Sequence, residues 1–208
     1  SRKESFEQAK GDFERVLYEI KGKQQRMKIL GDLENNMEGF TGSVKMVLKA
    51  SKQGRIGGIF GTVAQMIGVE PQYAVAIETA LGGAMQNIIV ENEEIAKRCI
   101  RFLKEQRGGR ATFLPITSVK GYELREQGLE NCEGFIANAA RLVSYDPKFS
   151  GIIASLLGRI VIAEDIDSAT RIAKRYGYKF RIVTLDGQVI NAGGSFTGGS
   201  AQRSGGVI

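Results

Sequence analysis

The sequence contains no histidine and no tryptophan, and it has only two cysteines. Without histidine, the chain cannot form a Ser-His-Asp or Cys-His catalytic centre, and it lacks the commonest ligand of transition metals. Cys99 and Cys132 do not have the spacing of metal ligands. Cys99 lies in the apolar pattern of an expected helix, where a buried free thiol is the usual arrangement. We therefore expect neither a metal site nor a cofactor in this chain.

Long apolar runs are also missing. None approaches the ~20 residues that cross a bilayer, and the charged residues 1–10 are not followed by the apolar core of a signal peptide. One disulfide is arithmetically possible, but nothing in the sequence requires an oxidising compartment. We expect a cytoplasmic protein without membrane contact. The first residue is Ser and not Met, which suggests a segment of a longer chain.

Size and charge set the remaining limits. A chain of 208 residues, 42% of them hydrophobic and 25% charged, can bury one or two cores. The formal net charge of +6 indicates an anionic partner without proving one, because many basic domains bind nothing anionic.

The first 35 residues contain no proline, and their apolar residues repeat in heptads. One column contains Phe6, Phe13, Ile20 and Met27, and the other contains Ala9, Val16 and Leu30, with Lys23 in its one polar position. This pattern favours a coiled coil. A single amphipathic helix lying on its own domain remains the alternative, and three glycines lower the helix propensity.

A strand–helix–strand pattern occurs twice. Residues 87–90 and 111–116 are predicted strands around a helix over residues 93–106, and residues 159–162 and 180–185 are strands around a helix over residues 165–175. Such alternation predicts an α/β fold with mixed sheets and partly parallel strands. Two copies suggest two related subdomains, so we expect an N-terminal coiled-coil helix at 1–36, subdomains at 37–122 and 123–200, and a tail at 201–208.

Glycine is concentrated in three places. Residues 54–61 predict a loop or strand-turn segment, and Gly82-Gly83 is expected to end a helix that begins near Pro71. Asp186-Gly187 predicts a hairpin turn, and residues 193–199 follow it. Glycine at this density permits positive φ and a close approach of backbones.

The glycine segments do not match known phosphate-binding patterns. The P-loop sequence is absent, residues 57–61 do not form a dinucleotide fingerprint, and residues 193–199 lead to no predicted helix. Two acidic clusters lie where helices begin, as capping and the helix dipole favour; they are Glu91, Glu93 and Glu94, and Glu164, Asp165 and Asp167. We assign them no acid–base catalysis, and we assign Asp186 to its turn.

Three groups of basic residues have few acids between them. They are Lys97, Arg98, Arg101, Lys104, Arg107 and Arg110; Arg171, Lys174, Arg175, Lys179 and Arg181; and Lys45, Lys49, Lys52 and Arg55. Helix C-termini favour cations, so solvated helix faces would explain most of these residues. Alternatively, the groups merge into one positive surface that contacts phosphates without reading bases, in which case binding is sequence-independent and salt-sensitive.

Taken together, the segments resemble the hinge domain of SMC proteins, most closely the bacterial chromosome-segregation type. The likeness runs in order from about residue 37 to residue 200 and lies in four segments: GRIGGIFGTVAQMIGVEPQYAVAIETALGGAMQNIIVEN (54–92), GRATFLPI (109–116), LVSYDPKFSGIIASLLGRIVIAEDIDSATRIA (142–173) and RIVTLDGQVINAGGSFTGGS (181–200). The heptad helix fits too, because the SMC hinge is an insert between the two strands of a long antiparallel coiled coil.

The resemblance implies a homodimer of hinges that joins two arms of an SMC ATPase for chromosome condensation and segregation on the nucleoid. It implies an interface at Gly82, Gly83, Gly193, Gly194, Ser195, Phe196, Thr197, Gly198 and Gly199. ATPase motifs are missing here, so this chain is not expected to be an enzyme, and other subunits of the complex would bind elsewhere on the full-length chain.

Non-sequence-specific contact with DNA is a further expectation. The candidate residues are Lys97, Arg98, Arg101, Lys104, Arg171, Lys174, Arg175, Lys179 and Arg203. Arg203 is the one basic residue after the last glycine segment, so we expect a short or absent C-terminal coil.

Two rival functions remain open. One is a small α/β enzyme that binds a phosphorylated ligand at its glycine loops. The other is a basic nucleic-acid-binding module that acts as a monomer.

Overall fold

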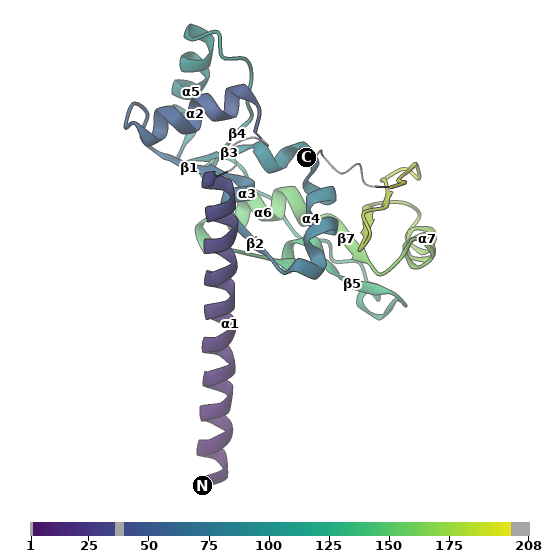
Figure 1. Cartoon of the computed structure of the whole chain (residues 1–208). Helices are drawn as coiled ribbons and strands as arrows, with labels where there is room; N and C mark the ends of the chain where they lie inside the picture. Colours follow the sequence, from purple (N-terminus) through teal and green to yellow (C-terminus); the bar gives the residue numbers. More distant parts are fainter. Residues whose placement is uncertain (1, 36–39, 201–208) are drawn as a thin grey trace.

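The computed structural model describes residues 2–35 and 40–200, with the side chains of residues 2–24 and 40–200. The predicted N-terminal helix is confirmed as α1 (Arg2–Asn35), which continues through its glycines. Figure 1 shows the N-terminal part of α1 projecting away from the rest of the molecule, while the other end of the helix contacts β2 (Ile67–Val69) and α3 (Val63–Met66). Phe6 and Phe13 of the heptad are 71% and 65% exposed. A second helix along this seam stays a prediction.

The first strand–helix–strand unit comprises β3 (Ile88–Val90), α5 (Glu93–Glu105) and β4 (Phe113–Pro115). β3 and β4 are parallel, and β1 (Ile59–Thr62) pairs antiparallel with β3. α2 (Gly42–Lys52) lies beside α5 (Figure 1). The buried core between these elements consists of Phe40, Val44, Val47, Ala50, Ile56, Ile88, Val90, Cys99 and Leu103.

The second unit comprises β7 (Ile160–Ala163), α7 (Ile166–Arg175) and β8 (Arg181–Thr184), and its two strands are again parallel. Its sheet has five strands in the order β10-β9-β8-β7-β5. The other three strands, each antiparallel to its neighbour, are β5 (Phe135–Asn138), β9 (Val189–Ile190) and β10 (Phe196–Thr197). Leu129, Val161, Ala163, Ala169, Ile172, Ala173, Phe180, Ile182 and Ile190 form the core under α7.

The same local signals begin both unit helices. The Asn92 side chain accepts a hydrogen bond from the Ile95 amide at 3.1 Å, and the Asp165 side chain accepts one from the Ser168 amide at 2.7 Å. These bonds satisfy amide groups that have no partner within the helix. Gly177, with φ 66°, ends α7 as predicted. The predicted repeat of two α/β units with parallel strands is confirmed.

The two sheets share a third core. β2 (Ile67–Val69) pairs antiparallel with β6 (Val143–Tyr145), and α4 (Ala74–Leu81) and α6 (Ser150–Leu157) pack into the same cluster. Its buried residues come from both units, among them Ile89, Leu114, Ile162 and Val183. The predicted boundary between residues 122 and 123 stays a prediction.

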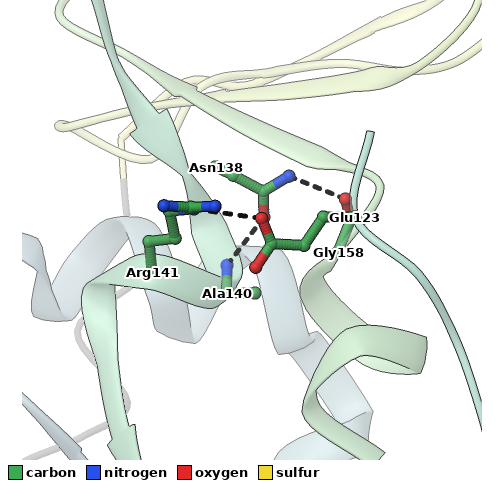
Figure 2. A network of polar contacts seen from close by, with 5 residues as sticks. All are labelled: Glu123, Asn138, Ala140, Arg141 and Gly158. Atoms are coloured by element: carbon green, nitrogen blue, oxygen red, sulfur yellow. Dashed lines mark hydrogen bonds and ion pairs between the residues drawn. The ribbon is translucent and has the colours of Figure 1, made fainter. Parts of the chain in front are cut away.

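The chain between the two units lies tightly against α6. A Cβ on Gly121 would overlap the backbone nitrogen of Ser155, and the Leu124 amide donates to the Gly158 carbonyl at 2.9 Å. Figure 2 shows the polar contacts beside it, where Arg141 pairs with Glu123 at 3.0 Å. In the same network the buried Asn138 donates to the Gly158 carbonyl at 2.7 Å and accepts from the Ala140 amide at 3.0 Å. The connection is therefore fixed against α6 and the turn that contains Arg141.

Short elements complete the described fold. They are α3 (Val63–Met66) and the 3-10 turns η2 (Pro71–Tyr73), η3 (Gly82–Gln86), η4 (Leu129–Asn131), η5 (Ala139–Leu142) and η6 (Pro147–Phe149). Pro71 begins η2, directly before α4, as its fixed φ favours. Over residues 2–35 and 40–200, the structure contains no helix with the length and apolar character of a membrane span.

Candidate dimer interface and basic surfaces

Residues 193–199, the second of the two glycine segments expected at the interface, form the outer edge of the five-stranded sheet. β8 and β9 form the predicted hairpin at Asp186-Gly187, and β10 then pairs with β9 through Phe196 opposite Ile190 and Thr197 opposite Val189. Both β10 residues are exposed, Phe196 by 53%. In Figure 1 this segment lies at one extreme of the molecule, drawn in yellow. The edge thus offers backbone groups and an aromatic side chain to another chain.

Three glycines of this segment have backbone angles that other residues rarely adopt. φ is 92° at Gly193, 101° at Gly194 and 131° at Gly199, as predicted from the glycine density. A side chain at any of the three would be strained. Gly194 also faces the ring of Tyr178, which lies 3.5 Å from where a Cβ would stand.

Two amide side chains at β9 hold the glycine segment, and the sequence analysis did not identify them. Gln188 bonds both backbone groups of Gly199, at 2.8 and 3.0 Å. Asn191 donates to the Ser195 carbonyl at 3.3 Å and to the Thr197 hydroxyl at 3.2 Å. The only available signal was the position of two amides between a hairpin turn and a glycine-rich segment.

The first glycine pair lies on another element. Gly82, with φ 52°, ends α4, and Gly83 continues into η3. Two residues before Gly82, the Ala80 carbonyl accepts a hydrogen bond from Arg181 of β8 at 2.9 Å. The end of α4 is therefore bonded to the sheet that bears the second glycine segment.

A hollow of about 410 Å³ lies between α4 and that sheet. It is lined by Val75, Thr79, Arg181, Asp186, Gly187, Val189, Asn191, Thr197, Gly198, Gly199 and Ser200. Of the predicted interface residues, the structure thus brings Thr197, Gly198 and Gly199 beside α4. Within the described part of the chain, Gly82 and Gly83 do not line the hollow.

The basic residues of α5 form a surface with Arg55. Arg55, Arg98 and Arg101 line a shallow hollow of about 350 Å³, together with Phe102 and the acidic Glu105. Over the described residues, none of these three arginines forms an ion pair. Lys97 pairs with Glu94 at 3.0 Å, and Lys104 lies in the last turn of α5. α2, with Lys45, Lys49 and Lys52, packs beside α5. We call Arg55, Arg98 and Arg101 the arginine surface.

The α7 group is separate from the arginine surface. Figure 1 places α7 and α5 at opposite ends of the molecule, so the three basic groups do not merge into one surface. Arg171 donates to Ser168 Oγ at 3.2 Å, and Arg175 donates to Cys132 Sγ at 3.3 Å. Lys174 and Lys179 are exposed. Arg203 lies outside the described residues.

Of the acidic residues at the helix starts, Asp165 is the N-cap of α7, and Glu93, Glu94 and Asp167 lie in first helical turns, as predicted. The N-cap of α5 is instead Asn92. The Ser168 backbone hydrogen bond is the main cause that lowers the pKa of Asp165, and the Lys97 hydrogen bond is the main cause that lowers the pKa of Glu94. Asp186 accepts a hydrogen bond from the Thr184 hydroxyl within the hairpin turn. In residues 2–35 and 40–200, no group of three or more potential ligands could hold a metal ion.

Comparison with known proteins identifies the family. Residues 56–173 match the family model of the SMC proteins' flexible hinge domain. The chromosome partition protein Smc of Halothermothrix orenii is 41% identical over 194 residues, covering 92% of this chain and 16% of that protein. The Smc of Bacillus subtilis is 36% identical over 208 residues, covering 95% of this chain and 17% of that protein. The chain therefore spans about a sixth of the length of these relatives.

Solved structures agree with this family. An asymmetric dimer of the SMC hinge domain of Geobacillus stearothermophilus has a TM-score of 0.77 at 38% identity, covering 94% of this chain and 80% of that chain. The hinge domain of the Pyrococcus furiosus SMC protein has a TM-score of 0.66 at 30% identity, covering 88% and 94%. The matched sequence model, the mixed sheets and the projecting helix lead to one conclusion: the chain belongs to the SMC hinge domain family.

Proposed function

We propose that this chain is the homodimerisation hinge of an SMC chromosome-organising ATPase. Two hinges join two coiled-coil arms, and the complete protein acts in chromosome condensation and segregation on the nucleoid, in the cytoplasm. The chromosome partition proteins among its relatives support this role. ATP hydrolysis and the binding of other subunits belong to other parts of the complete protein.

The observation that carries the proposal is the exposed outer edge at β10. A strand at the edge of a sheet has unpaired backbone groups that another chain can bond. Here the edge also presents Phe196, an aromatic residue of the kind enriched in interfaces. The similar Geobacillus hinge forms a dimer, which is asymmetric in that structure. In a two-fold dimer each contact occurs twice, so modest contacts add up to a stable association.

Sedimentation equilibrium tests the dimer. The wild type should have a mass near twice 22.7 kDa. Phe196→Asp should weaken the dimer by at least roughly 30-fold, because a central aromatic contact commonly contributes about 2 kcal/mol or more. Ile100→Asp is the matched control, since Ile100 is 54% exposed but lies on α5. A monomeric wild type at micromolar concentration would contradict the proposal, as would equal weakening by both substitutions.

We further propose that the arginine surface contacts DNA without reading its sequence. Its three guanidinium groups are exposed and form no ion pair within the described residues, so phosphate groups can bind them without displacing a protein partner. Two of the α7 arginines, in contrast, already bond Ser168 and Cys132. The arginine surface is therefore the better candidate of the two basic surfaces.

The salt dependence of DNA binding tests this assignment. Each lost phosphate contact lowers the slope of log K against log salt by about 0.9, so Arg98→Glu/Arg101→Glu should lower it by about 1.8. Lys174→Glu/Lys179→Glu makes the same charge change on the other surface and should leave the slope nearly unchanged. Equal effects of the two variants would show that net charge, and not the arginine surface, determines binding.

A further inference from the structure

The Gln188 side chain bonds the backbone of Gly199 as a neighbouring strand's backbone would. Its Oε1 accepts from the Gly199 amide at 2.8 Å, and its Nε2 donates to the Gly199 carbonyl at 3.0 Å. Backbone pairing between β9 and β10 reaches only Val189 opposite Thr197. Beyond that pair, the backbone of Gln188 already bonds Thr184 across the hairpin. The Gln188 side-chain amide therefore continues the hydrogen bonding between β9 and β10 to Gly199, where the hairpin turn leaves no backbone partner.

A side chain at position 198 would displace the Gln188 amide from this arrangement. A Cβ on Gly198 would overlap Oε1 of Gln188 and stand 3.1 Å from its Cδ. Gly198 is not among the residues with positive φ, so its backbone would accept alanine. The obstacle within one chain is therefore the Gln188 amide, which an added methyl would push away from Gly199.

We infer that Gln188 is a positioning residue for the dimer interface: it bonds Gly199 and thereby keeps the exposed β10 edge extended and ready to pair. This inference rests on the proposed dimer. It differs from the simple expectation that Gly198 is small so that a partner chain can approach closely. In our account, Gly198 is small because Gln188 of the same chain lies against it.

A double-mutant cycle on dimer affinity separates the two accounts. Gln188→Ala removes the amide, and Gly198→Ala displaces it, so each should weaken the dimer by about 10-fold through the loss of the same two hydrogen bonds. The double variant should then also be weakened by about 10-fold. If a partner's approach requires Gly198, the two losses multiply to about 100-fold.

Asn191→Ala is the matched control. Asn191 is the other amide that bonds the glycine segment, but it contacts Ser195 and Thr197. Its effect should multiply with that of Gly198→Ala, because the two residues act on different bonds. Circular dichroism checks that every variant is folded, and hydrogen exchange of the Gly199 amide should accelerate in Gln188→Ala but not in Asn191→Ala.

The outcomes are distinct. The inference is supported if the double variant loses no more dimer affinity than either single variant and the Gly199 amide exchanges faster in Gln188→Ala. If the wild type is a dimer but the losses of dimer affinity in the two single variants multiply, the inference is wrong. It is also wrong if Gln188→Ala leaves the dimer affinity unchanged. In both cases the proposed dimer still stands. A monomeric wild type would instead overturn the proposed function itself.

Discussion

The two strand–helix–strand units follow one pattern but differ at the edges of their sheets. In the first sheet the edge strands β1 and β4 are buried or half-buried along their length. In the second sheet a hairpin adds β9 and β10 beyond β8, and both residues of β10 are exposed. The exposed edge comes from the added hairpin and not from the repeated unit, so a shared local pattern does not imply a shared role.

The unit helices differ in a second respect. Both have acidic first turns and basic last turns. Around α5, Arg98 and Arg101 line an open hollow, whereas around α7, Arg171 and Arg175 bond neighbouring polar atoms. A basic residue is available to a partner only when its own surroundings leave it free, and the surroundings of the two helices are different.

The largest effect should come from the cores. Ile88 lies in the core of the first unit and Ile162 in the core that both sheets share, and each is fully buried. Replacing either by alanine should lower the free energy of unfolding by roughly 2–5 kcal/mol. Because the shared core couples the sheets, urea unfolding should remain a single transition in both variants.

Circular dichroism and hydrogen exchange, measured at one protein concentration, check this prediction. Ile100→Ala, at an exposed position of α5, should change stability by no more than about 0.5 kcal/mol. An early, separate transition of the first unit in Ile88→Ala would show that the units unfold independently.

The next effect in size concerns the reactivity of the two free cysteines, of which one lies in each half of the molecule. Burial raises the pKa of the Cys99 thiol to about 11, whereas Cys132 is half-buried. Only the thiolate reacts, and at that pKa about one Cys99 thiol in a thousand is ionised at pH 8. Cys132→Ser, which keeps only the buried Cys99, should therefore react with a thiol reagent much more slowly than Cys99→Ser. Similar rates would mean that α5 opens readily.

The smallest expected effect is on stability and distinguishes the two helix caps, Asn92 of α5 and Asp165 of α7. Asn92→Ala should cost about 1 kcal/mol at any pH, because the amide does not titrate. Asp165 has its pKa lowered below the usual 3.8 in the folded protein, so its carboxylate stabilises the fold above that value and loses this contribution as pH falls through the folded pKa. The destabilisation by Asp165→Ala should thus disappear in acid, while that by Asn92→Ala persists. Urea unfolding at neutral and acidic pH measures both.

Local patterns predicted a large part of the fold. The cap at Asp165, the turn at Asp186-Gly187 and the positive φ of Gly193 depend on neighbours in sequence, and the structure contains them. The cap of α5 at Asn92 was not predicted, although its residue type directly before a helix is a local signal. α6 was not predicted, because it is short and apolar on nearly every face, and such a segment has no clear helical period. The sequence analysis also missed the pairing of β2 with β6, which joins segments more than 70 residues apart.

The sequence by itself determined the family, the repeated α/β units, the N-terminal helix and the glycine segments, because each depends on residue types at short, fixed spacing. Only the tertiary structure decided which basic groups lie apart, which arginines already have partners and which side chain lies against Gly198. These depend on the distance between residues such as Arg55 and Arg98, or Gln188 and Gly199. Such distances are set by the packing of sheets and helices, and no local pattern of residues specifies them.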